Sequence, residues 1–521
     1  MFKLSLHEAG GERSALTPAQ RRAAIAFAEA ILPGSERVRP GDERTVALTE
    51  RVVEHVSPLV AKLWRNALVL LDRAAVLSTG RRFADLSAHE QQRLLERWEK
   101  DPVLRAPLGA VAFAFKFTHF DTEDVYRALG GRLNVVQNLE QPRWLSQIVR
   151  AAEHDASETI ECEVVVVGTG AGGAVVGKEL ADRGYAVVFV EEGEHHRRDA
   201  FTGSSLQAHF DFYRGSLTVG NAVMPIFMGR LVGGSTAINT GSCFRTPAWV
   251  LDRWCEELDT DELAPERMRP YFERVERTLT VEPADRAAIG PIADIMARGC
   301  DALGWKHAVM LRNAPGCRGE GFCDFGCRTD ARKSTNLSYI PAALTKGALL
   351  FTGLRATRVI VEGGRARGIE GVDALGRTLT VRADVVVFAG GALPTPVFLL
   401  QQGLCNSSGQ VGRNLTVHPS TACSALMDEP VNGHKHIPQG YYVEEFLPEG
   451  ILINAAQADK NFVPLMFSLT GQRLMEVVEK SDCIVSFGIL AADARQGGVV
   501  YSGPGGMPIV RYNLTKEDCA R

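Results

Sequence analysis

The stretch that most constrains the fold runs from Val164 to Gly193 and reads VVVVGTGAGGAVVGKELADRGYAVVFVEEG. The run ECEVVVV, which begins at Glu161 and leads into this stretch, is typical of a parallel strand that is buried on both faces. A glycine-rich turn follows, then a helical pattern, then a second strand, YAVVFV. This order of strand, turn, helix and strand predicts one unit of a doubly wound α/β fold.

The glycines of this turn have the spacing G-x-G-x-x-G, at Gly168, Gly170 and Gly173. In such a turn the first glycine permits the tight bend, the second lets the backbone approach a pyrophosphate, and the third lets the helix pack closely on the strand. Glu191 lies 23 residues after Gly168, where a carboxylate can accept hydrogen bonds from ribose hydroxyls. These features favour dinucleotide binding over an ordinary glycine-rich turn.

A second glycine-rich loop, MGRLVGGSTAINTGSCFR, spans residues 228–245. Gly229, Gly233 and Gly234 open its backbone, and Ser235, Thr236 and Asn239 offer hydrogen-bonding groups. A plain nicotinamide domain leaves such a loop unexplained, whereas an extended FAD needs protein at its isoalloxazine end as well. The second loop therefore favours FAD over NAD, and a nicotinamide dehydrogenase is the weaker interpretation.

The composition of the chain limits the kinds of molecule that it is expected to bind. The 58 basic and 62 acidic residues nearly cancel, so no broad field attracts nucleic acid, and a small molecule is the expected partner. No apolar stretch is long enough for a signal peptide or a membrane span, and the eleven cysteines are scattered over a long chain. We expect a cytoplasmic protein with reduced thiols and no transmembrane segment.

Five motifs occur in the order seen in one family. They are GTGAGG with EEG, GRLVGGSTAIN, LDRWCEELDTDELAPERMRPYFERVE, DVVVFAGGALPTPVFLL and VGRNLTVHP. The chain resembles the glucose-methanol-choline (GMC) oxidoreductases, which are FAD enzymes, from about Glu161 to Asp518. The branch it resembles most is that of the long-chain alcohol oxidases and related bacterial dehydrogenases. One departure is LLQQGLCN, where the family usually has an SG pair after LL.

The resemblance implies the cofactor site residue by residue. The pyrophosphate would be held at Gly168, Gly170, Ala171 and Gly173, and the adenosine ribose at Glu191. Arg230, Gly233, Gly234, Ser235 and Asn239 would line the flavin side, Val359 would touch the adenine through its backbone, and Gly390 and Gly391 would bring a later loop back to the nucleotide. No metal is expected.

The implied fold is a Rossmann-like, doubly wound FAD-binding domain of GMC type, an α+β substrate domain and an N-terminal helical region. We expect the helical region at residues 1–158, the FAD domain at 159–295 and 346–420, a cysteine-containing loop or lid segment at 296–345, and an apparently truncated substrate domain at 421–521. The apolar periodicity of residues 16–152 favours helices that pack without chemistry.

The segment CRGEGFCDFGC sets Cys317, Cys323 and Cys327 at spacings of six and four. Three close thiols suit a zinc or iron–sulfur site, but such a closed site needs a fourth ligand, which Cys300 or Cys243 could supply only through the fold. A structural, glycine-rich loop, which could also cover the active site, is the favoured interpretation.

The family oxidises an alcohol by removing the hydroxyl proton with a base while the carbinol hydride passes to the flavin. The histidine base of the family lies in a later segment, so we expect this chain to be a fragment whose base lies beyond Arg521. His418 matches a histidine near the flavin, with a structural role favoured over catalysis. His434 and His436 are expected to be solvated, and His195 and His196 to lie on the surface.

Two hypotheses therefore follow. In the first, the chain is an FAD-dependent oxidoreductase that acts on CH–OH groups of a long-chain or sterol-like alcohol. In the second, it is a flavin-binding but catalytically incomplete module that needs a partner. Oxygen, a quinone and a cytochrome remain open as electron acceptors, as does the oligomeric state.

Overall fold

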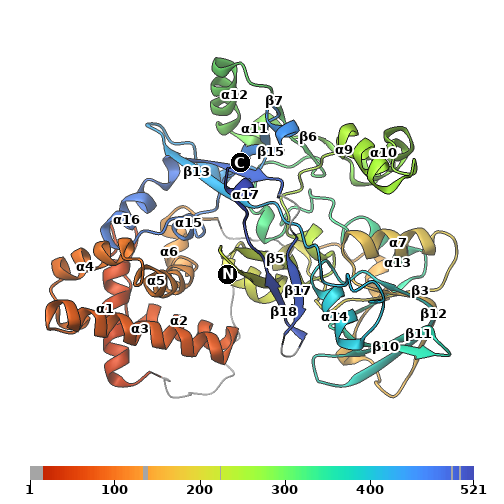
Figure 1. Cartoon of the computed structure of the whole chain (residues 1–521), viewed down its shortest axis with the longest axis horizontal. Helices are drawn as coiled ribbons and strands as arrows, with labels where there is room; N and C mark the ends of the chain where they lie inside the picture. The colour runs from red at the N-terminus through yellow and green to blue at the C-terminus, as the bar shows by residue number, and fades with distance from the viewer. Residues whose placement is uncertain (1–15, 133–138, 223, 494–496, 504–505, 521) are drawn as a thin grey trace.

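The computed structural model describes residues 16–132, 139–222, 224–493, 497–503 and 506–520. These residues form sheets of seven, five, four and two strands, together with an N-terminal layer of helices. Figure 1 shows the helical layer on the left and the seven-stranded sheet on the right, with the four-stranded sheet between them and the five-stranded sheet above.

The seven-stranded sheet has the order β1-β9-β3-β2-β12-β11-β10. Its first five strands are parallel, and β11 and β10 continue it as an antiparallel meander. The strands are β1 (Ile148–Arg150), β2 (Ile160–Val167), β3 (Val187–Val190), β9 (Leu349–Thr352), β10 (Arg355–Glu362), β11 (Arg365–Val372) and β12 (Thr378–Phe388).

Strand β2 is buried on both faces, as its β-branched run predicted. Val164 and Val166 pack beneath α7 (Ala171–Ala181) and α13 (Tyr339–Thr345), while Val165 and Val167 belong to a separate core on the other face. The predicted α/β fold with a parallel, doubly covered sheet is confirmed.

The N-terminal layer packs around its own apolar core, in which Phe27, Phe83 and Trp98 stack against one another. Side chains of α16 (Gly471–Glu479), from the far end of the chain, complete this core. The layer consists of α1 (Pro18–Ile31), α2 (Glu43–Val56), α3 (Pro58–Thr79), α4 (Ala88–Lys100), α5 (Arg105–His119) and α6 (Glu123–Ala128).

The five-stranded sheet has the order β13-β16-β15-β14-β7, and the four-stranded sheet the order β17-β18-β4-β5. Their strands are β4 (Tyr213–Val219), β5 (Pro225–Gly229), β7 (His307–Val309), β13 (Ser420–Leu426), β14 (Tyr441–Val443), β15 (Ile451–Ala455), β16 (Ile484–Ala491), β17 (Val499–Ser502) and β18 (Pro508–Arg511). The short sheet pairs β6 (Glu282–Pro283) with β8 (Leu311–Arg312).

The remaining helices connect or cover these sheets (Figure 1). They are α8 (Ser205–Gln207), α9 (Ala248–Leu258), α10 (Pro265–Leu279), α11 (Arg286–Ile289), α12 (Ile292–Leu303), α14 (Pro394–Gln402), α15 (Val463–Met466) and α17 (Lys516–Ala520).

Several strands pair across the boundaries of the segments predicted from the sequence. Strand β1 falls in the region predicted to be helical, yet it extends the parallel sheet beside β9. Strand β7 falls in the predicted cysteine segment but pairs with β14, and β4 falls in the predicted FAD segment but pairs with β18. Each difference is a pairing between residues far apart in the chain, which a local pattern does not encode.

None of the helices in the described residues is both long and apolar enough to cross a lipid bilayer.

Candidate FAD and active site

The first glycine loop joins β2 to α7. Gly168 has φ +98°, a conformation that side chains rarely adopt, and its amide donates to the carbonyl oxygen of Val190 at 2.8 Å. Gly170 is the N-cap of α7, so the unsatisfied amides of the first helical turn lie at the carboxyl end of the parallel strands. This is the position at which a helix N-terminus attracts an anion.

Glu191 is buried at the end of β3, and hydrogen bonds fix its carboxylate. One oxygen accepts from the amide and the hydroxyl of Thr169 at 3.1 and 2.6 Å, and the other accepts from the Gly193 amide at 3.0 Å. Burial raises the pKa of Glu191 despite these bonds. The carboxylate therefore ties the first glycine loop to the end of the neighbouring strand.

The second glycine loop packs directly on the first. The Gly233 amide donates to the hydroxyl of Thr169 at 3.0 Å, and Gly234 lies so close to Gly170 that a side chain at 234 would meet its Cα. The Ser235 hydroxyl accepts from the Gly229 amide at 3.0 Å and holds this loop against β5. Two segments about 60 residues apart in the chain thus form one wall.

The two loops, Gly390 and Gly391 after β12, and the β4–β5 hairpin enclose a cavity of about 900 Å³. Nine of the thirteen predicted cofactor residues line it: Gly168, Gly170, Ala171, Glu191, Arg230, Gly234, Ser235, Gly390 and Gly391. The structure therefore brings together the parts of the site that the sequence had predicted from separate motifs.

The other four predicted residues do not line this cavity. Gly173 lies in the first turn of α7, where a Cβ would strike the Gly168 carbonyl oxygen. Gly233 contacts the first glycine loop through its amide, which donates to the Thr169 hydroxyl. The Asn239 side chain accepts from the Gly241 amide, and the Val359 amide donates to the side chain of Gln402.

Several lining residues have no counterpart in the sequence prediction. Leu354, Arg355 and Ala356, at the start of β10, occupy the wall on the side where Val359 was expected. Arg214 of β4 forms an ion pair with Glu192 across the cavity wall. No local motif marks these residues, because their position depends on where β10 enters the sheet and on how the hairpin folds over.

The histidines differ from expectation. Among the described residues, His418 is the histidine that lines the cavity, and its side chain is exposed. His434 is buried rather than solvated, and burial lowers its pKa to about 3. His195 and His196 are half-buried rather than on the surface, and burial lowers the pKa of each to about 4. The ring of His195 contacts that of Trp144 and the ring of His196 contacts that of Phe212, and the polar sequence around these histidines does not reveal such contacts.

The cysteine segment lies away from the cavity wall. Arg312 donates to the Cys323 sulfur at 3.2 Å and approaches the Cys317 sulfur at 4.0 Å, while the Arg332 amide donates to Cys327 at 3.5 Å. All eleven cysteines, each within the described residues, are free thiols. The same residues contain no group of three or more His, Cys, Asp or Glu side chains arranged to hold a metal ion.

Comparison with known proteins identifies the family. The model of the GMC oxidoreductase family matches residues 162–420. An uncharacterised GMC-type oxidoreductase of Mycobacterium tuberculosis is 31% identical over 467 residues, which are 88% of this chain and 72% of that protein. A long-chain-alcohol oxidase of Arabidopsis thaliana, FAO3, is 28% identical over 392 residues, or 65% of this chain and 52% of that protein.

A solved structure agrees on the fold. Pyridoxine 4-oxidase from Mesorbium loti superposes with a TM-score of 0.53 at 15% identity, covering 67% of this chain and 75% of that one. The predicted family, the fold and, with the family, the cofactor are confirmed. The chain belongs to the glucose-methanol-choline family of FAD-dependent oxidoreductases.

Proposed function

We propose that this chain binds FAD in the cavity between its two glycine loops and oxidises an alcohol there, with a long-chain primary alcohol as the preferred donor. The observation that carries the proposal is the convergence of three glycine-rich segments, from residues 168–172, 229–234 and 390–391, on one cavity of about 900 Å³. An extended dinucleotide needs such a continuous backbone wall, because its phosphates and rings contact protein along their whole length.

The residues of the wall have separable roles in this proposal. Gly170 and Ala171 present the first amides of α7 to the pyrophosphate, and Glu191 accepts hydrogen bonds from the ribose. Arg230 is held by its hydrogen bond to the Phe210 carbonyl at 2.6 Å, which fixes a positive charge at the flavin side. When bound, FAD supplies the acceptor for the hydride of the alcohol carbon.

The flanks of the cavity suit an apolar donor. Ile226, Phe227 and Met228 of β5 line it together with Val397 and Phe398 of α14, and Ile226 and Met228 pack against the apolar cluster that contains Val397. Apolar walls of this kind bind the chain of an alcohol by burying its methylene groups. The relation to long-chain-alcohol oxidases supports the same donor class, although this chain spans about half the length of the Arabidopsis protein FAO3.

The proton of the alcohol must pass to a base, and the resemblance favours a structural role near the flavin for His418, in contact with the cofactor or with the loop, over this catalytic role. Replacing His418 by Ala separates the two possibilities. Loss of FAD with no change in the rate per bound flavin indicates a cofactor contact, whereas full FAD occupancy with a loss of rate indicates the base.

The test of the function is the visible spectrum of the purified chain, loaded with FAD and freed of oxygen, before and after addition of a long-chain alcohol. We expect a bound flavin band that bleaches faster with dodecanol than with ethanol at equal concentration. A chain that binds no flavin would overturn the cofactor site. A bound flavin that no alcohol bleaches would overturn alcohol oxidation by this chain.

A further inference from the structure

Helix α3 presents a stripe of leucines to solvent. Leu59, Leu63, Leu70 and Leu77 are 64, 58, 48 and 90% exposed. Their spacings of four and seven residues place all four within an arc of about 40° on an α-helix, which turns by about 100° per residue. Single exposed leucines are common on protein surfaces, but an aligned row is typical of an interaction surface.

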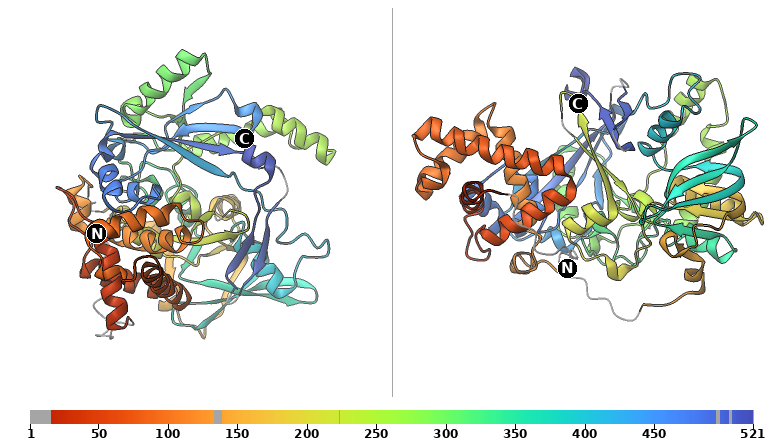
Figure 2. Two further views of the ribbon diagram at one scale, coloured as in Figure 1. Left: turned by 60° about the vertical axis from the view of Figure 1, so that its left-hand side comes forward. Right: turned by 90° about the horizontal axis from the view of Figure 1, so that it is seen from below.

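This stripe has no role in the core of the helical layer. The buried side chains of α3 include Trp64, Leu68 and Leu71, which lie about half a turn away from the leucines. The helix therefore carries apolar residues on two opposite faces, and only one of them is covered by the rest of the chain. Figure 2 shows the helical layer at the end of the molecule farthest from the nucleotide-binding sheet.

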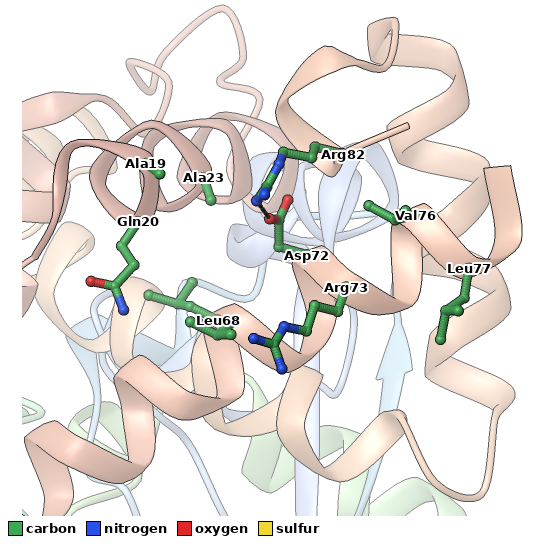
Figure 3. Close-up of a pocket in the computed structure, with 10 residues that line it drawn as sticks. Ala19, Gln20, Ala23, Leu68, Asp72, Arg73, Val76, Leu77 and Arg82 are labelled. Carbon is green, nitrogen blue, oxygen red and sulfur yellow. Dashed lines mark hydrogen bonds and ion pairs between the residues drawn. The ribbon is translucent and has the colours of Figure 1, made fainter. Parts of the chain in front are cut away.

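A groove extends the apolar surface from α3 toward α1. It has a volume of about 440 Å³, and Ala23 of α1 and Leu68, Val76 and Leu77 of α3 are among its lining residues (Figure 3). Leu77 belongs to both the groove and the stripe, so the two form one continuous surface. We call this combined surface the α3 face.

The charges of the α3 face are basic. Lys62 and Arg73 flank the leucines and are exposed, and within the described residues neither has an ion-pair partner. Asp72 is the acidic residue of α3, but it is buried and paired with Arg82 at 2.7 Å (Figure 3). An occupant of this face therefore meets an apolar row beside unneutralised positive charge.

We propose that the α3 face docks on an anionic lipid surface, with the leucines in the interfacial region and Lys62 and Arg73 at the headgroups. The stripe is about 27 Å long at 1.5 Å per residue, which suits a helix that lies in the plane of the interface. A second copy of the chain fits the face less well, because it would bring the same basic residues toward each other. An anionic leaflet instead neutralises them. The inference rests on the α3 face alone and is independent of the proposed reaction.

The test is co-sedimentation of the full chain with sucrose-loaded vesicles of phosphatidylcholine, with and without phosphatidylglycerol. We expect binding to the anionic vesicles that weakens with added NaCl. The variant Leu63→Glu/Leu70→Glu should bind at least tenfold more weakly, and Lys62→Glu/Arg73→Glu should lose its preference for phosphatidylglycerol. All four side chains are surface residues, and unfolding midpoints verify that each variant is folded.

The matched control is Val361→Glu/Leu375→Glu, which replaces two comparably exposed apolar residues of the β10–β12 meander, on the opposite side of the molecule. It should bind vesicles as the parent does. The proposal is overturned if the parent does not bind anionic vesicles, or if the control weakens binding as much as the leucine variant. Sedimentation velocity adds a third such outcome: a parent dimer that the leucine variant dissociates, without lipid binding, would assign the face to a second copy.

Discussion

Gly170 offers a substitution that separates cofactor binding from folding. Gly170 has φ −69° and ψ −168°, which any residue adopts, and an added Cβ would meet no protein atom closer than the Gly234 Cα, at 3.9 Å. Gly170→Ala should therefore leave the apoprotein almost as stable as the parent. Alanine is a slightly poorer N-cap than glycine, but it reduces the entropy of the unfolded chain, and each effect is below about 1 kcal/mol.

The same methyl group would project from a backbone that lines the cavity. In a turn with this glycine spacing, the second glycine lets the backbone approach the pyrophosphate closely, so a methyl group at position 170 would occupy space that the phosphate needs. Loss of one charge-assisted hydrogen bond corresponds to about 1.5–3 kcal/mol, so we expect FAD to bind Gly170→Ala about 10- to 100-fold more weakly.

The assay is titration of the apoprotein with FAD, followed by flavin fluorescence, together with the urea midpoint of the apoprotein. Gly173→Ala serves as the contrasting variant, because its Cβ would strike the Gly168 carbonyl oxygen and push α7 away from the sheet. That variant should lose stability and FAD together. Parental FAD affinity in Gly170→Ala would refute the placement of the pyrophosphate, and a large loss of apoprotein stability would refute the steric argument.

Three further predictions concern other buried or helical positions. Glu191→Gln turns an amide NH₂ group toward at least one of the N–H and O–H donors of Thr169 and Gly193. FAD should therefore bind about tenfold more weakly in the same titration. Unchanged affinity would contradict a role of these hydrogen bonds in holding the cofactor site. Burial lowers the pKa of Lys116 from 10.5 to about 8, so its charge destabilises the fold by about 3 kcal/mol at pH 7, and this penalty declines as the pH rises from 8 toward 10.5. Lys116→Met removes this penalty but also loses the hydrogen bond to the Phe467 carbonyl, which is worth about 1 kcal/mol. We therefore expect the free energy of unfolding, measured in urea, to rise by about 2 kcal/mol at pH 7 and to change little at pH 10. Equal gains at the two pH values would contradict the titration argument. Gly109→Ala, inside α5 with no atom within 4 Å of the new Cβ, should raise the free energy of unfolding by about 1 kcal/mol, and a destabilised variant would show that the site is not open.

The sequence predicted best what is local. The glycine spacing, the β-branched strand and Glu191 act within one β-strand, helix and β-strand unit, so their positions follow from neighbours in the chain. Their roles in the wall also follow from backbone geometry, which any fold of this type must satisfy. The residues that the β2–α7–β3 unit contributes to the cavity wall could therefore be predicted from the sequence.

The residues that β10 contributes to the cavity wall depend on the register of this strand in the sheet. The sequence placed Val359 at the cofactor, but the structure places Leu354, Arg355 and Ala356 in the cavity wall. The sequence does not reveal a shift of a few residues along β10, because this edge strand pairs with β11 through irregular register. The contribution of β4 is not encoded locally either, because its partner β18 lies far later in the chain.

Helix α3 shows a different limit. Its sequence predicts a helix, but apolar residues on both faces give no indication of which face the core covers. Only the packing of Trp64 against Phe115 and of the other buried residues identifies the covered side. The exposed leucines become informative only after that assignment, which is why the α3 face has no counterpart in the sequence prediction.

The helical layer does not form its core from its own residues alone. Leu474, Met475 and Val478 of α16 complete its core. Lys116 bonds to the Phe467 carbonyl at 2.8 Å, and Glu99 accepts from the amide and hydroxyl of Thr470 at 2.8 and 2.7 Å. The helical layer therefore packs on α16 and the residues before it, and the same segment continues into β16 of the five-stranded sheet. Because these contacts join the helical layer to residues 467–478, the stability of the α3 face and that of the sheet beside the cavity should be coupled, and the layer is best studied within the whole chain.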